Sequence, residues 1–357
     1  SIGKKRLDYQ VHEPIISKSA ETHLLRCIKS NYVSSFGEYL SKFEDKLKDI
    51  TGSKYIVLTN SGTAALFISL KQLEVEKCEV LTPSMTFAAT SNAIVYNDAI
   101  PHYIDSMKSN PCIDIDKLAL YLSETCIIKK NFCYNKVSKR RIKALIVVHA
   151  FGYTAEMSKL IKLCNKYNIK ILEDAAGALG SYYKNKHVGT FSDFGILSFN
   201  GNKIVTTGMG GAILMKKHKD YKMVKHLIST ARLEHPYEIE HDKVGYNLRM
   251  SNINAALGYS QLLSFKTTLK KKKILCEKYI SNISKTELCN FIIENKRFFP
   301  KRELASGIIG FTGIDNQGLA GIEYQYDKDL KGTVVKTVLR KDAHGKLVQF
   351  NGQANGR

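Results

Sequence analysis

Between about residues 54 and 215, short apolar runs alternate with amphipathic stretches along the chain. The apolar runs have the length of strands, and the stretches between them repeat apolar residues at helical spacing. The expected strands are residues 55–58, 79–81, 102–104, 144–148 and 169–172, and the expected helices include residues 63–73, 87–96, 115–122 and 155–167. Strands separated by helices in this way usually pair in parallel, with helices on both faces of the sheet. The alternation therefore predicts an α/β domain with a mostly parallel sheet flanked by helices.

The alternation is interrupted once and ends before the C-terminus. Residues 124–142 are rich in Lys, Asn and Cys, which indicates a surface insertion. From residue 251 to 279 apolar residues recur at helical spacing, which predicts one or two long helices. From about Phe291 the sequence becomes rich in glycine and turns, so we expect a boundary near residues 285–292 and an atypical C-terminal segment.

The formal net charge of +21 indicates an anionic partner. The excess is mostly lysine spread along the chain, without the interleaved aromatic residues that stack on nucleic-acid bases. We therefore expect no nucleic-acid partner. An anionic small molecule, such as a phosphate-bearing cofactor or a nucleotide sugar, fits the charge better.

The eight cysteines are scattered and form no C-x-x-C pair, so we expect neither a disulfide framework nor a metal site. No apolar run reaches the roughly 20 residues that cross a bilayer. The N-terminal residues lack the apolar core of a signal peptide. The expectation is a protein of the reducing cytoplasm without a membrane partner.

Three separated segments place polar residues at the ends of expected strands. The first, residues 60–65, follows a strand and opens a helix. Gly62 lets the backbone approach an anion, the amides of the first helical turn point towards it, and Thr63 adds a hydroxyl. Taken alone, the segment is also an ordinary strand-to-helix turn with an N-cap.

The second segment ends an apolar strand with Asp174. A carboxylate at the C-terminal edge of a parallel strand faces the crevice in which such sheets bind ligands. There it would keep a pyridine nitrogen protonated and turn the ring into an electron sink. Taken alone, Asp174 as the N-cap of a following helix is the simpler explanation.

The third segment, residues 198–203, reads Ser-Phe-Asn-Gly-Asn-Lys and lies next to an expected strand. In a partly desolvated crevice the amine of Lys203 would lose its proton readily enough to attack an aldehyde. Ser198 would then hold a phosphate. A glycine-rich hairpin that carries an exposed lysine explains this segment, taken alone, about as well.

Together these segments match one family closely. From about residue 37 to 279 the chain resembles the DegT/DnrJ/EryC1/StrS aminotransferases. Residues 36–44 resemble that family's entry helix, residues 83–92 its cofactor-stacking segment, residues 148–152 its strand-end His-x-x-Gly, and residues 245–256 the segment that reaches the neighbouring subunit's cofactor.

The resemblance implies a fold type I transferase that binds pyridoxal 5′-phosphate (PLP). Lys203, bonded covalently to PLP, and Asp174, at the ring nitrogen, would be the catalytic residues. The residues implied for cofactor binding are Ser61, Gly62, Thr63, Phe87 on the ring face, Asp174, Ser198, Lys203 and the Asn247 of a second subunit. The resemblance also implies a homodimer with shared active sites.

The implied reaction moves an amino group from an amino acid, expected to be glutamate, to a nucleotide-linked 4-keto-6-deoxy sugar. Such a reaction belongs to surface-polysaccharide or nonulosonic acid biosynthesis. Residues 133–141 and 198–203 resemble the legionaminic acid pathway branch, which aminates UDP-linked sugars, and perosamine synthases form a neighbouring branch. Gly177 and Met209 depart from the family pattern, and Gly177 would loosen the orientation of the cofactor.

The family resemblance covers about residues 1–285, and residues from about 290 to 357 resemble a non-catalytic fragment of class B penicillin-binding proteins. We therefore expect an aminotransferase large domain with the start of its C-terminal helices at residues 1–288, and the penicillin-binding-protein-like fragment at residues 289–357. The two would form a chimera of two reading frames; a diverged family C-terminal domain is the alternative. For the whole chain, the alternatives to an active enzyme are a PLP-binding remnant without turnover and a cell-wall-associated non-catalytic scaffold.

Overall fold

The computed structural model describes residues 14–107, 109–235 and 237–283, together with residues 340–341 and 347–348. The chain divides into two compact units, Ser1–Ile280 and Ser281–Arg357. In the second unit the described residues are the end of a helix and two short strands, β12 (Arg340–Lys341) and β13 (Leu347–Val348), which pair antiparallel. The rest of the predicted C-terminal fragment lies outside the described residues.

The first unit is built around a nine-stranded sheet whose main path is β1-β11-β10-β7-β6-β2-β3. Its strands are β1 (Tyr55–Thr59), β2 (Glu79–Pro83), β3 (Ile100–Ile104), β4 (Cys126–Lys129), β5 (Phe132–Asn135), β6 (Arg141–Val148), β7 (Lys170–Asp174), β10 (Phe194–Ser198) and β11 (Gly211–Met215). Along the main path β11 runs antiparallel to both β1 and β10, and the neighbouring pairs from β10 to β3 are parallel. The predicted mostly parallel sheet is therefore confirmed, and each of the five expected strands is present.

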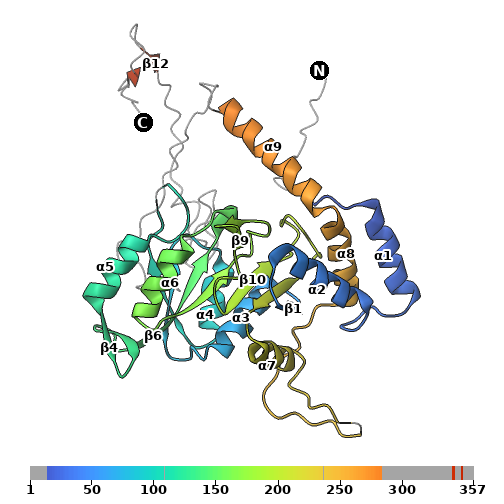
Figure 1. Ribbon diagram of the computed structural model, residues 1–357, viewed down its shortest axis with the longest axis horizontal. Helices are drawn as coiled ribbons and strands as arrows, with labels where there is room; N and C mark the ends of the chain where they lie inside the picture. Colours follow the sequence, from blue (N-terminus) through green and yellow to red (C-terminus); the bar gives the residue numbers. More distant parts are fainter. Residues whose placement is uncertain (1–13, 108, 236, 284–339, 342–346, 349–357) are drawn as a thin grey trace, which may run out of the picture. The chain divides into compact units, whose positions relative to one another are not determined.

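Successive residues of a strand point to opposite faces of the sheet. Both faces carry apolar residues here, and helices cover both. In β6, Ile146 packs in an apolar core with helices α3, α4 and α7. Leu145 and Val147 of the same strand pack on the other face with α5 and α6, and α2 and α8 continue that cover over β1, β10 and β11 (Figure 1). The helices are α1 (Lys18–Lys29), α2 (Glu38–Thr51), α3 (Gly62–Gln72), α4 (Ala88–Val95), α5 (Ile115–Thr125), α6 (Met157–Lys166), α7 (His218–Ile228), α8 (Asn252–Leu263) and α9 (Phe265–Ile283).

Residues 124–142, expected as a surface insertion, extend the sheet. They form the β4–β5 hairpin, which pairs through Cys133 and Tyr134 with the start of β6. Asn135 at the end of β5 donates from its Nδ2 to the buried Glu79 carboxylate, at 3.0 Å. A buried carboxylate needs such a partner, so this contact ties the hairpin to β2.

The short elements lie at the periphery of this arrangement. A 3₁₀ turn, η1 (Ala150–Gly152), follows β6, and a small hairpin of β8 (Tyr182–Tyr183) and β9 (Lys186–His187) follows β7. From residue 251 to 279 one or two long helices were expected, and two helices, α8 and α9, are present. Within the described ranges, no helix combines the length and apolarity needed to cross a membrane.

The strands that run in one direction finish at one edge of the sheet. The residues that directly follow these strands include Asn60 after β1, Ser84 after β2, Asp105 after β3, His149 after β6, Ala175 after β7 and Phe199 after β10. The three polar segments singled out in the sequence therefore meet at this carboxyl edge, where open α/β sheets bind ligands.

Candidate active site

The start of α3 and the end of β10 form one side of the site. Ser61 is the N-cap of α3, and its hydroxyl accepts from the Ala64 amide at 3.0 Å. A Cβ on Gly62 would lie 2.9 Å from the Cβ of Ser198, so glycine is what allows the helix to approach the strand end. Gly62, Thr63 and the Ser198 hydroxyl thus surround the positive end of a helix dipole, which suits a phosphate.

Asp174 forms a second part of the site at the end of β7. The residue is 5% exposed. Its Oδ2 accepts from the Thr90 hydroxyl at 2.8 Å, and its Oδ1 accepts from the Ala176 amide at 3.1 Å. The described residues that follow form turns, so Asp174 is not the N-cap of a helix and the simpler explanation is wrong. The carboxylate is instead held at the sheet edge with a fixed orientation.

The neighbouring Glu173 explains why the end of β7 is rigid. Its buried carboxylate accepts from the amides of Gly189 and Ser192, both at 2.7 Å, and from His149 Nε2 at 3.1 Å. Burial alone would raise the pKa of Glu173, but the hydrogen bonds from His149, the Gly189 amide and the Ser192 hydroxyl outweigh it and lower the pKa. Glu173 therefore anchors one face of the strand end, while Asp174 faces the other.

Lys203 lies in the loop that follows β10. Its amide donates to the Asn200 carbonyl at 3.0 Å, which forms a turn, and its side chain is half-buried. Burial lowers the pKa of the Lys203 amine, and the Asp174 carboxylate opposes this and raises it. The lysine is thus partly desolvated and within the electrostatic influence of Asp174, unlike an exposed lysine on a hairpin.

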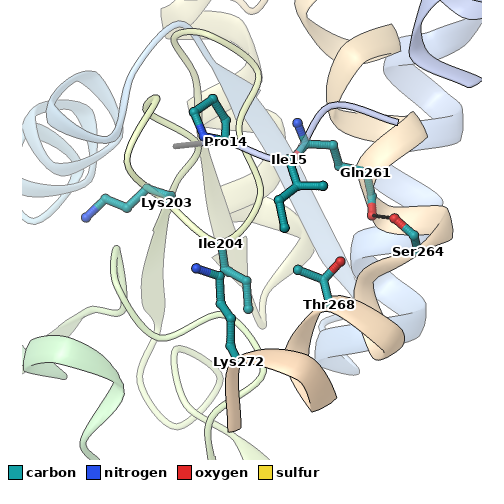
Figure 2. Close-up of a pocket in the computed structure, with 8 residues that line it drawn as sticks. All are labelled: Pro14, Ile15, Lys203, Ile204, Gln261, Ser264, Thr268 and Lys272. Carbon is teal, nitrogen blue, oxygen red and sulfur yellow. Dashed lines mark hydrogen bonds between the residues drawn. The ribbon is translucent and has the colours of Figure 1, made fainter. Parts of the chain in front are cut away.

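A small cavity of about 10 Å³ borders the lysine on the side of α8 and α9. Its lining includes Lys203, Gln261, Ser264 and Thr268. Figure 2 shows the Lys203 side chain extending away from these helical residues, so its amine points towards the opposite side.

Phe87 and Asn247 have positions that a bound molecule or a second subunit can reach. Phe87 is the N-cap residue of α4 and is 80% exposed. Asn247 is exposed on a segment whose backbone forms an isolated bridge with Ser229. The predicted contact of Asn247 is with another chain, so it stays a prediction.

Thr90 and His149 were not among the predicted site residues, although they lie in the segments at residues 83–92 and 148–152 that resemble those of the family. Thr90 lies on the first turn of α4, three residues after Phe87, and His149 directly follows β6. The sequence signals for them were their positions. Thr90 lies just after the start of an expected helix, and His149 lies just after the end of an expected strand. Among the described residues, no group of three or more His, Cys, Asp or Glu side chains is arranged to hold a metal.

Comparisons with known proteins find a matching family model and similar curated proteins. Residues 14–297 match the model of the DegT/DnrJ/EryC1/StrS aminotransferase family. The chain is 32% identical over 275 residues to the GDP-perosamine synthase of Escherichia coli O157:H7, covering 77% of this chain and 71% of that protein. It is also 32% identical to the UDP-4-amino-4,6-dideoxy-N-acetyl-beta-L-altrosamine transaminase of Campylobacter jejuni subsp. jejuni (strain 81-176), covering 76% and 68%.

A solved structure supports the same assignment. The PLP-form of the sugar aminotransferase-like protein Spr1654 from Streptococcus pneumoniae superposes with a TM-score of 0.67 at 26% identity. The superposition covers 77% of this chain and 71% of Spr1654. The range that matches the family model includes every predicted residue of the candidate site.

Proposed function

Because the chain belongs to the DegT/DnrJ/EryC1/StrS aminotransferase family, and is a PLP-dependent aminotransferase of fold type I, we propose that it aminates a nucleotide-linked 4-keto-6-deoxy sugar. The proposed amino donor is glutamate, and the product would serve surface-polysaccharide or nonulosonic acid biosynthesis. The observation that carries the proposal is the half-buried Lys203 amine, whose pKa is influenced by the carboxylate of the buried Asp174. Both residues lie at the sheet edge at which Gly62 lets the start of α3 approach Ser198.

The residues at the sheet edge fit PLP. The Ser61–Thr63 turn and Ser198 would hold its phosphate at the start of α3. Asp174 would pair with its ring nitrogen, and the exposed Phe87 would pack on its ring face. When bound, PLP supplies an electron sink that stabilises negative charge at the α-carbon of the amino donor.

The chemistry of the chain's own residues follows from their surroundings. Asp174 holds the proton at the pyridine nitrogen, because its oriented carboxylate favours the charged ring. Lys203 moves the proton at the α-carbon of the amino donor, as general base and then acid. Its burial-lowered pKa keeps more of the amine neutral at a given pH than in an exposed lysine.

The proposed assembly is a homodimer with shared active sites, in which Asn247 reaches the cofactor phosphate of the partner. Exposed apolar residues support this. Tyr237, Ile239 and Val244 are each more than two-thirds exposed on the segment between α7 and α8, and Figure 1 shows this segment projecting away from the sheet. Apolar residues gathered in this way are typical of an interface.

The proposed substrate branch is the one that aminates UDP-linked 4-keto-6-deoxy-acetamido sugars, as in the legionaminic acid pathway. The forms of residues 133–141 and 198–203 support it. The names of two relatives support a nucleotide-linked amino sugar more broadly, one with GDP and one with UDP. GDP-linked substrates are therefore the second candidate.

Absorbance of the purified protein tests the function. Covalently attached PLP should make the protein yellow, and glutamate should bleach the colour in the first half-reaction. D-glutamate is the matched control, because it offers the same charges with the wrong handedness. Colour that glutamate leaves unchanged would favour a PLP-binding remnant, and a colourless protein would favour a non-catalytic scaffold. A panel of UDP- and GDP-linked 4-keto sugars then identifies the acceptor that restores the colour.

For the C-terminus we propose a join near residue 288, with residues 289–357 derived from a penicillin-binding-protein-like reading frame. The sequence likeness of residues 290–357 supports this. Mass spectrometry of the protein from its native source is the test. A continuous peptide across residues 285–300 would exclude an assembly error and leave a genuine rearrangement or a designed fusion.

A further inference from the structure

The loop that carries Lys203 is closed at its base by its own backbone. We call residues 199–207 the lysine loop. The Thr207 amide donates to the Phe199 carbonyl at 2.9 Å, and the Phe199 amide donates to the Gly210 carbonyl at 2.9 Å. Bonds at the base close a loop without fixing how its tip lies over the sheet. The position of Lys203 therefore depends on what packs against the loop.

One face of α8 supplies that packing. Asn254, Gly258 and Gln261 are four and three residues apart, so they share a face of the helix. Gln261 Oε1 accepts from the Thr206 amide at 3.0 Å, and Asn254 Nδ2 donates to the Thr207 carbonyl. The two side chains therefore hold the backbone of two consecutive residues, Thr206 and Thr207, at the end of the lysine loop.

Gly258 allows the loop to lie this close to the helix. A Cβ at this position would lie 2.6 Å from the Thr207 Cγ2 and 2.7 Å from the Phe43 Cζ. Both distances are shorter than any ordinary contact, so a side chain here would displace Thr207, Phe43 or both. The helix thus contacts the loop through two hydrogen bonds and a close approach between them.

We propose that the Asn254–Gly258–Gln261 face of α8 is a platform that sets the position of Lys203, with Gln261 as the principal positioning residue. The proposal rests on the proposed role of Lys203 in binding PLP. Gln261 acts three residues from the lysine, on an amide that is buried with Thr206. A buried amide without an acceptor is costly, so losing Gln261 would make the loop move to find one.

The orientation of the Gln261 amide shows which of its atoms does the holding. Its Oε1 accepts from Thr206, whereas its Nε2 is buried without a hydrogen-bond partner among the described residues. Figure 2 places Gln261 beside the cavity that Lys203 and Ile204 also line. A carboxylate would keep the acceptor and lose the unused donor, and its added negative charge would strengthen the hydrogen bond that it accepts from the Thr206 amide. A thioether of similar shape would lose the acceptor.

This difference gives the test. In cofactor-free protein, Gln261→Met should speed hydrogen exchange of peptides covering residues 199–207 about tenfold, and Gln261→Glu should leave it near the native rate. In Gln261→Met, PLP should also bind about tenfold more weakly. The pH midpoint for covalent attachment of PLP should rise, because a loosened loop admits water to an amine whose pKa is lowered mainly by burial.

Thr51→Val is the matched control. It removes a buried acceptor from a backbone amide, that of Ser53 at 3.2 Å, at the far end of α2. It should lower the melting temperature to a similar extent without moving the three measured properties of the lysine loop. A general loss of stability is thereby separated from a change in the position of Lys203.

Unchanged exchange, PLP affinity and pH midpoint in Gln261→Met would overturn the proposal. If that variant does not fold, Gly258→Ala replaces it, since alanine favours the helix while its methyl pushes on Thr207. Native behaviour of Gly258→Ala would equally overturn it. Failure of borohydride to fix PLP on Lys203 in the native protein would sink the proposed function, whereas exchange in the cofactor-free protein still decides whether the platform holds the loop.

Discussion

Replacing Lys203 by alanine is expected to abolish covalent attachment of PLP and to slow transamination by at least 10²- to 10⁴-fold, roughly the contribution of a general acid–base residue. The reason is that the same amine both holds the cofactor and moves the proton at the α-carbon. The measurement is borohydride reduction followed by peptide mass spectrometry. Cofactor fixed to the protein in Lys203→Ala would show that another lysine carries it.

Lys216 provides the matched control for this result. Burial lowers the pKa of its amine as well, with Lys186 adding to the effect. Lys216 lies beyond β11, and its Nζ donates to the Phe191 carbonyl. Lys216→Ala should therefore keep the yellow colour and the transamination rate. This result would show that a lysine needs more than a lowered pKa to bind PLP and must also lie at the carboxyl edge of the sheet.

The pH dependence of attachment follows from the direction of the Lys203 shift. An amine attacks an aldehyde only after it has lost its proton, so attachment becomes faster as pH rises through the pKa of the lysine. Because burial lowers that pKa, the half-maximal rate should be reached below the ordinary lysine value of about 10.4. A midpoint at or above that value would contradict the burial of the amine.

The sheet was largely predictable because its strands and helices carry their pattern locally. The expected strand at residues 169–172 appears as β7, and the expected helix at residues 63–73 appears as α3. Strand direction is not local: β11 runs against its neighbours, and its apolar sequence carries no sign of this. The β4–β5 hairpin was expected as a surface insertion because its polar, lysine-rich composition hides the pairing with β6.

The candidate site was predictable to the extent that its residues sit at the ends of such elements. Asp174 and Ser198 end strands, and Gly62 opens a helix, so the topology alone brings them to one edge. Gln261 could not be found in this way. Its partner Thr206 is 55 positions away in the chain, and only the packing of α8 on the lysine loop joins the two.

Asp174→Asn is expected to lower the transamination rate by roughly 10²- to 10³-fold, a magnitude typical of removing one oriented electrostatic partner. Asparagine keeps the size of the side chain. Its oxygen can still accept from the Ala176 amide, which donates to Asp174 Oδ1 at 3.1 Å. Its NH2 group would take the place of Oδ2 and donate to the Thr90 hydroxyl, which donates to Oδ2 at 2.8 Å in the native protein. The fold should therefore survive. What is lost is the negative charge that keeps the ring nitrogen protonated, so colour should persist while bleaching by glutamate becomes slow.

Asp174→Asn should also change the pKa of the Lys203 amine. Because the Asp174 carboxylate raises the pKa of Lys203, its removal should lower that pKa further and move the pH midpoint of PLP attachment downwards. Thr90→Val is the control: it removes the hydroxyl that donates to Asp174 but leaves the charge, so the rate should fall by about tenfold or less with the midpoint nearly unchanged. A slow Asp174→Asn enzyme whose midpoint does not fall would mean that the carboxylate acts on the substrate side alone. An unimpaired rate would remove Asp174 from the catalytic residues.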